Sequence, residues 1–169
     1  MVPSAYMQAM SAFVAQNMGA GRPDRAKKAL IGAISTSLAV GVILSYFSFF
    51  HGGLLAQLFA RDAAVIAAAA EYLKAYAVDF LLVSFLFCII GYFNGCGRTA
   101  FVMIQGIAGA FLVRISVSWM MSRVQPVSLF GVGLATPAST VVQLLLCAGY
   151  FVWMHHREKK MPAVPFVVE

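Results

Sequence analysis

The sequence predicts an all-α membrane protein, a bundle of about four full transmembrane helices plus one truncated N-terminal helix. Apolar residues make up 62% of the 169 residues and charged residues only 11%, whereas soluble domains are about half apolar and about one quarter charged. A chain of this composition cannot cover its surface with polar groups, so lipid must be part of its solvent. Runs of alternating polarity are missing from the pattern, which leaves helices as the elements that satisfy their backbone within lipid.

Long apolar runs mark the expected helices. A membrane-spanning helix needs about 20 apolar residues, and four runs reach that length, at residues 29–50, 72–95, 100–122 and 134–155. A fifth run, at residues 2–18, is shorter, and we expect it to be the end of a helix whose beginning is missing or abbreviated. We therefore expect residues 1–155 to form one membrane domain and residues 156–169 a basic tail.

The segment at residues 54–70 separates the first two full spans. It contains Arg61 and Asp62, which makes it too polar to cross the bilayer alone. We expect an interfacial helix followed by the approach to the next span.

Basic residues predict the orientation of the spans. Cytoplasmic loops carry the excess of Lys and Arg, and one side of the alternating spans holds eight such residues against three on the other side. The C-terminus falls on the basic side, so we expect it in the cytoplasm. The eight are Arg22, Arg25, Lys27, Lys28, Arg98, Arg157, Lys159 and Lys160, and the three are Arg61, Lys74 and Arg123.

Several function classes are excluded by the same residues. The basic clusters lie between apolar runs rather than on one face of a soluble domain, which argues against nucleic-acid binding. The three cysteines form no CxxC pair or Cys/His cluster, so neither a disulfide framework nor a zinc site is indicated. HExxH, GxSxG and a phosphate-binding loop are missing. We expect no enzyme and no cofactor.

Small residues predict where helices pack together. One span carries a small residue at every fourth position, and a later span repeats the spacing at Gly106 and Ala110. Close backbone approach between small residues drives helix association in lipid, so we expect helix–helix seams there. The first series is Ala29, Ala33, Ser37, Gly41 and Ser45.

Two ionisable residues lie deep in apolar runs, Asp79 and Arg114. Each costs about 2.5–3.5 kcal/mol at a helix centre, so each should face protein or a cavity. Asp79 lies 18 residues before Gly97 and Arg114 lies 17 residues after it, which places them at nearly the same depth in a helical hairpin. Three interpretations remain open: a buried ion pair, a carboxylate that binds sodium or a proton, and a side chain that reaches to the interface.

Other polar residues in the spans give weaker signals. Tyr76, Gln105 and Ser84, together with Thr140 and Gln143, either line a pathway or merely form hydrogen bonds between helices. The sequence does not decide between these two roles.

Four segments resemble the multidrug and toxic compound extrusion (MATE) transporters. AFVAQNMGAGRPDRAKKAL resembles the cytoplasmic loop signature of that family, and NGCGRTAFVMIQG, AFLVRISVS and LFGVGLATPAS resemble later segments in the same order. The resemblance implies part of a twelve-helix, two-lobe transporter, with this chain matching the end of helix eight through helix twelve. The signature loop then contains Gln16, Asn17, Gly19, Gly21 and Arg25.

The resemblance also implies a function. MATE transporters export organic cations and drugs across the plasma membrane in exchange for sodium or protons, and some use a carboxylate on helix ten. Asp79 lies on the matching helix, about one turn further outward than the aspartate of the best-known sodium-coupled branch. The implied partners are the lipid bilayer, the exported compounds and the missing N-terminal lobe. A lipid-linked oligosaccharide flippase and a non-transporting membrane partner protein remain the alternatives.

Overall fold

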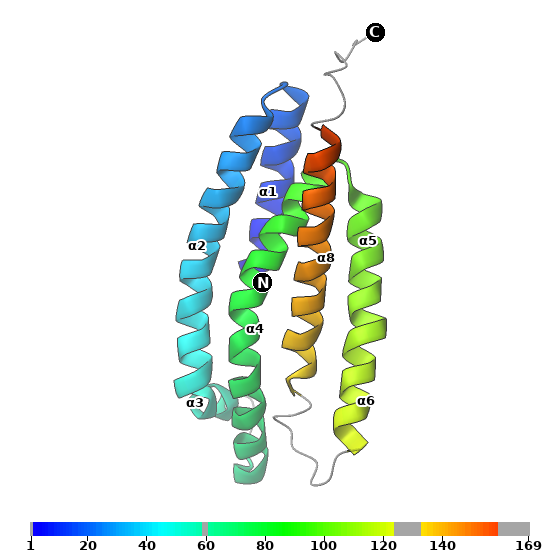
Figure 1. The fold of residues 1–169 in the computed structure, drawn as a ribbon. Coiled ribbons are helices and arrows are strands. Elements are labelled where there is room, and N and C mark those ends of the chain that lie inside the picture. Colours follow the sequence, from blue (N-terminus) through cyan, green and yellow to red (C-terminus); the bar gives the residue numbers. More distant parts are fainter. Residues whose placement is uncertain (1, 59–60, 124–132, 159–169) are drawn as a thin grey trace.

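The computed structural model describes residues 2–58, 61–123 and 133–158. In these residues the chain forms helices that run side by side as an elongated bundle (Figure 1). The elements in chain order are α1 (Val2–Gly19), α2 (Pro23–Phe50), α3 (Gly52–Gln57), α4 (Ala63–Gly95), α5 (Thr99–Ile107), the π-helix η1 (Ala108–Ile115), α6 (Ser116–Arg123) and α8 (Ala135–Glu158).

The described part of the chain contains four helical segments that are long and apolar enough to cross a membrane. They are Pro23–Phe50, Ala63–Gly95, Thr99–Arg123 and Ala135–Met154. The third segment combines α5, η1 and α6 in one rod. The prediction of an all-α membrane protein is confirmed.

Two helices begin earlier than the apolar runs suggest. The helix α2 begins at Pro23 rather than near residue 29, because proline fits the first turn, where its missing N–H has no helical partner. The helix α4 begins at Ala63 rather than near residue 72. Its N-cap is Asp62, whose carboxylate accepts a hydrogen bond from the Ala64 N–H at 2.8 Å. Asp62 therefore starts a helix instead of interrupting one.

The polar segment at residues 54–70 is divided between two helices. Its first residues belong to the short helix α3, and its last residues form the beginning of α4. Residues 59–60 and 124–132, and residues 159–169 of the expected basic tail, lie outside the described residues.

The α1–α2 connection is a tight turn closed by backbone hydrogen bonds. The Arg22 N–H donates to the Asn17 carbonyl at 2.8 Å, and the Gly21 N–H donates to the Met18 carbonyl at 3.0 Å. These two bonds form the Schellman arrangement, in which the residue after the helix is left-handed. Gly21 has a φ of +68°, a value that glycine adopts without strain.

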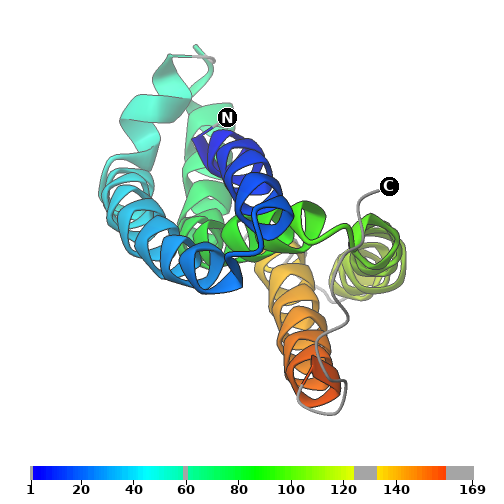
Figure 2. The ribbon, with the colours of Figure 1, turned by 90° about the horizontal axis from the view of Figure 1, so that it is seen from above.

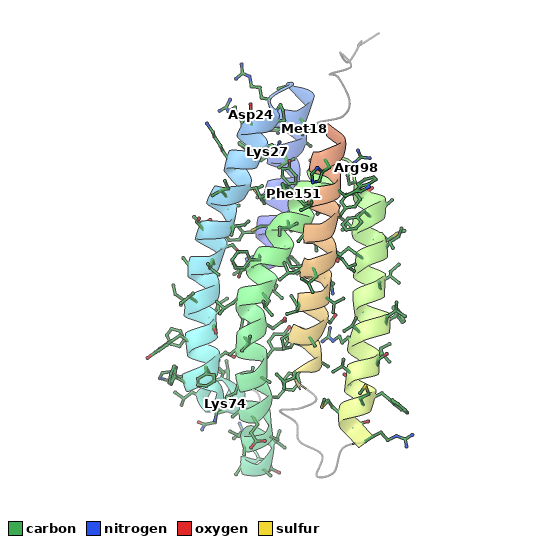
Figure 3. The ribbon with its side chains drawn as sticks, viewed as in Figure 1. Met18, Asp24, Lys27, Lys74, Arg98 and Phe151 are labelled. Atoms are coloured by element: carbon green, nitrogen blue, oxygen red, sulfur yellow. The ribbon has the colours of Figure 1, made fainter. Side chains whose placement is uncertain are left out.

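The α4–α5 connection repeats this turn. The Arg98 N–H donates to the Phe93 carbonyl at 2.9 Å, and the Gly97 N–H donates to the Asn94 carbonyl at 3.0 Å, with a φ of +74° at Gly97. Both turns therefore read Gly-x-Gly-Arg with the second glycine left-handed. They lie at the same end of the bundle, and Figure 3 shows Lys27 and Arg98 at that end and Lys74 near the opposite end.

The helix α4 occupies the middle of the bundle (Figure 2) and packs against α1, α2 and α8. Glycines permit its closest contact: a Cβ atom on Gly91 would lie 2.6 Å from the Met7 carbonyl oxygen, and one on Gly95 would lie 2.5 Å from the Val14 Cβ. The buried apolar cluster around this contact consists of Met10, Val14, Ala26, Leu30, Leu86, Cys88, Ile90, Tyr92, Phe93, Cys147 and Met154.

The small residues of α2 do form a seam with α4. Ser37 is buried, its hydroxyl donates to the Ser84 carbonyl at 3.4 Å, and a Cβ on Gly41 would lie 2.5 Å from the Ser84 Oγ. The expectation for the later pair is wrong within the described residues. Gly106 has open space where a Cβ would project, and Ala110 is exposed.

Candidate functional site

A cavity of about 370 Å³ lies between α4, η1, α8 and the first residues of α1. It brings together the two ionisable residues that lie deep in the apolar runs, Asp79 and Arg114. The lining residues are Pro3, Ser4, Tyr76, Asp79, Phe80, Val83, Leu86, Phe87, Arg114, Thr136, Ser139, Thr140 and Gln143.

Asp79 is the most deeply buried charged group of this cavity, with 1% of its surface exposed. Its Oδ1 accepts a hydrogen bond from the Thr140 hydroxyl at 2.6 Å. Its buried Oδ2 has no hydrogen-bond partner among the residues that the structure describes. A buried acceptor without a partner is costly, and a buried carboxylate more so. The arrangement therefore leaves one carboxylate oxygen available to a cation, a proton or water.

Thr140 supplies the only side-chain hydrogen bond that Asp79 receives from the described residues. The same hydroxyl lies 3.1 Å from the Thr136 carbonyl oxygen, to which it can also donate. A hydroxyl has one hydrogen, so Thr140 bonds either the carboxylate or its own helix. Carboxylate, hydroxyl and carbonyl oxygens are the ligands that hard cations prefer, and this corner of the cavity presents all three.

Arg114 lies on η1 and lines the same cavity. It is near enough to interact electrostatically with Asp79, yet the unpartnered Oδ2 shows that its guanidinium does not donate there. The two side chains therefore share a cavity without a hydrogen bond between them.

Four polar residues of α8 line the cavity at helical spacing: Thr136, Ser139, Thr140 and Gln143. The Ser139 hydroxyl donates across to the Gly109 carbonyl of η1 at 2.8 Å. Gln143 donates to the Ser139 Oγ at 3.3 Å. This stripe connects η1, which carries Arg114, to the helix that holds Asp79.

A protein-family model described as MatE matches residues 1–120. The chain belongs to the MatE family. This finding confirms the family that the four sequence segments indicated.

Similar curated proteins come from a plant and a bacterium. The chain is 28% identical over 152 residues to Protein DETOXIFICATION 20 of Arabidopsis thaliana, and the matched region covers 85% of this chain and 31% of that relative. It is 30% identical over 132 residues to Protein DETOXIFICATION 22 of the same plant, covering 78% and 27%. It is 26% identical over 147 residues to Probable multidrug resistance protein YoeA of Bacillus subtilis (strain 168), covering 86% and 32%. The chain thus spans about a third of the length of these relatives, and no solved structure matches it.

Of the three pathway candidates of this MatE chain, Tyr76 lines the cavity and the other two do not. Ser84 is 3% exposed, donates to the Phe80 carbonyl at 2.7 Å and lies in the α2–α4 seam. Gln105 is 2% exposed, and its Oε1 has no partner among the described residues. Ser84 therefore has a packing role, and Gln105 is buried elsewhere on α5.

The signature-loop residues are part of the α1–α2 turn rather than the cavity. The Asn17 side chain donates to the Phe13 carbonyl at 2.7 Å, while the Arg25 N–H donates to the Arg22 carbonyl at 3.2 Å. Gln16 and Gly19 are exposed, and Gly21 makes the left-handed turn. In the described structure these residues fix the geometry of the turn.

Sequence reasoning missed Thr136 and Ser139 and gave Thr140 only a weak signal. The polar stripe was visible as spacings of three and four residues within the apolar run of α8. Such a stripe predicts one polar helix face, although it does not say which helix that face meets.

Proposed function

We propose that this chain is part of a transporter that exports organic cations and drugs across the plasma membrane, coupled to the entry of sodium or protons. One observation carries the proposal: Asp79 is buried in a cavity, and one of its carboxylate oxygens has no partner among the described residues. An ionised carboxylate in such surroundings is stabilised by any cation that reaches it.

The cavity suits alternate occupation by two kinds of cation. A sodium ion or a proton takes the free oxygen of Asp79 with the Thr140 hydroxyl beside it. An organic cation meets aromatic walls from Tyr76, Phe80 and Phe87, because aromatic faces attract cations. A coupling cation that binds one conformation more tightly shifts the equilibrium toward that conformation.

The names of the relatives support the exported class of compounds. One relative is called a multidrug resistance protein and two are called DETOXIFICATION proteins. Since the chain matches about a third of each, we infer that a further lobe completes the transporter, as alternating access uses two repeats around one site.

The basic turns support the orientation. Lys27 and Arg98 lie at the same end of the bundle (Figure 3), and cytoplasmic ends carry the excess of basic residues. We propose that this end and the C-terminus face the cytoplasm.

The test is uptake of a fluorescent organic cation into inside-out vesicles that contain the complete transporter, with an imposed sodium or proton gradient. We expect gradient-driven uptake that Asp79→Asn abolishes. Asp62→Asn is the matched control, because asparagine also caps a helix and Asp62 is exposed. Uptake that ignores both gradients, or that Asp79→Asn leaves intact, would overturn the proposal.

A further inference from the structure

The rod formed by residues Thr99–Arg123 is not a uniform α-helix. Its middle third, Ala108–Ile115, is a π-helix flanked by the α-helices α5 and α6. Backbone bonds in a π-helix join residues five apart, and such segments are rare and concentrated at functional sites. Arg114 lies within this segment.

The π-helix changes the direction in which Arg114 points. An α-helix advances about 100° per residue, so a residue five positions on lies about 140° around the axis. In a π-helix, whose backbone bonds join residues five apart, the fifth residue lies only about 50° around the axis and so on the same face. Gly109 is buried against α8, and Arg114 follows it by five positions. The π-helix therefore turns Arg114 toward the side that meets α8, whereas an α-helix would turn it away.

One hydrogen bond from α8 reaches the first turn of the π-helix, and a second bond, within α8, holds its donor. The buried Ser139 hydroxyl donates to the Gly109 carbonyl at 2.8 Å, and Gln143 donates to the Ser139 Oγ at 3.3 Å. Gly109 allows this approach, because a Cβ atom there would collide with the Gln143 side chain. The Ser139 hydroxyl thus bonds a backbone carbonyl of the irregular segment, the kind of side-chain insertion that accompanies helix irregularities.

We propose that Ser139 is a positioning residue. Its bond to the Gly109 carbonyl keeps residues 108–115 in the π form, and the π form keeps Arg114 at the wall of the Asp79 cavity. The consequence of this placement rests on the proposed function: Arg114 is a cation fixed to the chain, and it competes with the coupling cation for Asp79. Conversion of the π-helix to an α-helix withdraws this competitor.

The direction of position 114 is measured by cysteine labelling of the full chain in membranes. Arg114→Cys is introduced after Cys88, Cys96 and Cys147 are replaced by alanine, and a charged methanethiosulfonate reagent is added. Arg114 and Leu112 are both exposed on the rod, but only Arg114 lines the cavity. We expect rapid labelling at position 114 and slow labelling of the control Leu112→Cys, since a thiol on the apolar span outside the cavity would face lipid. Equal labelling at the two positions would overturn the proposal.

The role of Ser139 is tested in the same background. Ser139→Ala slows labelling at position 114 about fivefold, the factor that corresponds to a hydrogen bond of about 1 kcal/mol. Ser139→Thr keeps the hydroxyl and restores the rate. The control Ser35→Ala has no effect, because Ser35 is exposed and bonds a carbonyl of its own helix. An unchanged rate in Ser139→Ala contradicts the proposal.

Deletion of Leu112 provides an independent test of the π-helix. The deletion leaves three residues between Gly109 and the arginine, so the two lie four positions apart, a spacing that an α-helix accommodates on one side. The chain should therefore fold, and the position of Arg114 should still label. If residues 108–115 were α-helical, the deletion would rotate everything after it by about 100°, so loss of folding or of labelling contradicts the proposal.

Cation dependence separates this inference from the proposed function. In the complete transporter, Ser139→Ala should lower the sodium or proton concentration needed for half-maximal uptake by about fivefold, the factor of one hydrogen bond. Arg114→Gln should lower that concentration as well, because it removes the competing charge, and Ser139→Thr should not. If labelling behaves as expected but uptake depends on no cation in any variant, the positioning role of Ser139 stands and the proposed cation-coupled transport is overturned. If uptake depends on a cation but labelling fails, the positioning role is overturned and the proposed transport stands.

Discussion

Replacement of Thr140 by valine tests the hydrogen bond on which the site depends. The change removes the hydroxyl that donates to Asp79 Oδ1 at 2.6 Å. Because Oδ2 already has no partner, the carboxylate would be left without any hydrogen bond from the described residues. Hydrogen bonds between membrane helices contribute about 0.6 kcal/mol on average and at most about 1.7, while bonds to charged groups contribute about 1.5–3 kcal/mol. We therefore expect a loss of about 1.5 kcal/mol.

The assay is thermal unfolding of the purified chain in detergent at neutral pH. For a chain of this size, about 1.5 kcal/mol corresponds to a fall in Tm of about 3–6 °C. Thr140→Ser keeps a hydroxyl and should recover most of the loss. Thr36→Val is the matched control, because the Thr36 hydroxyl is exposed and donates within its own helix to the Gly32 carbonyl. Its effect should stay within about 0.5 kcal/mol.

A double-mutant cycle identifies Asp79 as the partner. In an Asp79→Ala background the hydroxyl of Thr140 has no carboxylate to bond, so Thr140→Val should cost little more. An equal cost with and without Asp79, or an equal cost in the Thr36→Val control, would refute the assignment of this hydrogen bond.

Three further outcomes follow from the fold. Gly91→Ala should cost about 1–3 kcal/mol in thermal unfolding because its Cβ would lie 2.6 Å from a backbone oxygen of α1, whereas Gly106→Ala, with open space around it, should cost nothing. Gly21→Ala should cost about 1–2 kcal/mol because its φ is +68°, and Gly19→Ala should be neutral; equal losses would contradict the left-handed turn. A single cysteine at Ala20 should react with an impermeant reagent in inside-out vesicles only, and reaction in right-side-out vesicles would reverse the orientation.

The helices and the two ionisable residues were predictable because their signals are local. An apolar run of about 20 residues requires a spanning helix, and a charge within such a run requires protein or a cavity around it. The shared level of Asp79 and Arg114 followed from counting along a hairpin around Gly97. The structure places both residues on one cavity.

Most of the remaining features depend on contacts between residues far apart in the sequence. The π-helix at Ala108–Ile115 is stabilised by Ser139, which is 30 residues from Gly109 in the sequence. Asp62 made the segment at residues 54–70 look too polar to cross the bilayer, whereas its carboxylate caps α4. Ser84 looked like a pathway residue because it is polar, yet it lies where α2 packs. For Ser139 and Ser84 tertiary partners decide the role, whereas the cap by Asp62 is a contact to Ala64, two residues along the chain, that hydropathy does not register.

The central claim is that Asp79 binds the coupling cation. Its most direct test is equilibrium binding of radioactive sodium to the purified chain, together with proton release on adding sodium to unbuffered protein. We expect either saturable sodium binding or, if a proton is bound in place of sodium, release of that proton by a competing organic cation. Whichever signal is seen should be lost in Asp79→Asn and kept in Asp62→Asn. Binding signals that persist unchanged in Asp79→Asn would contradict it.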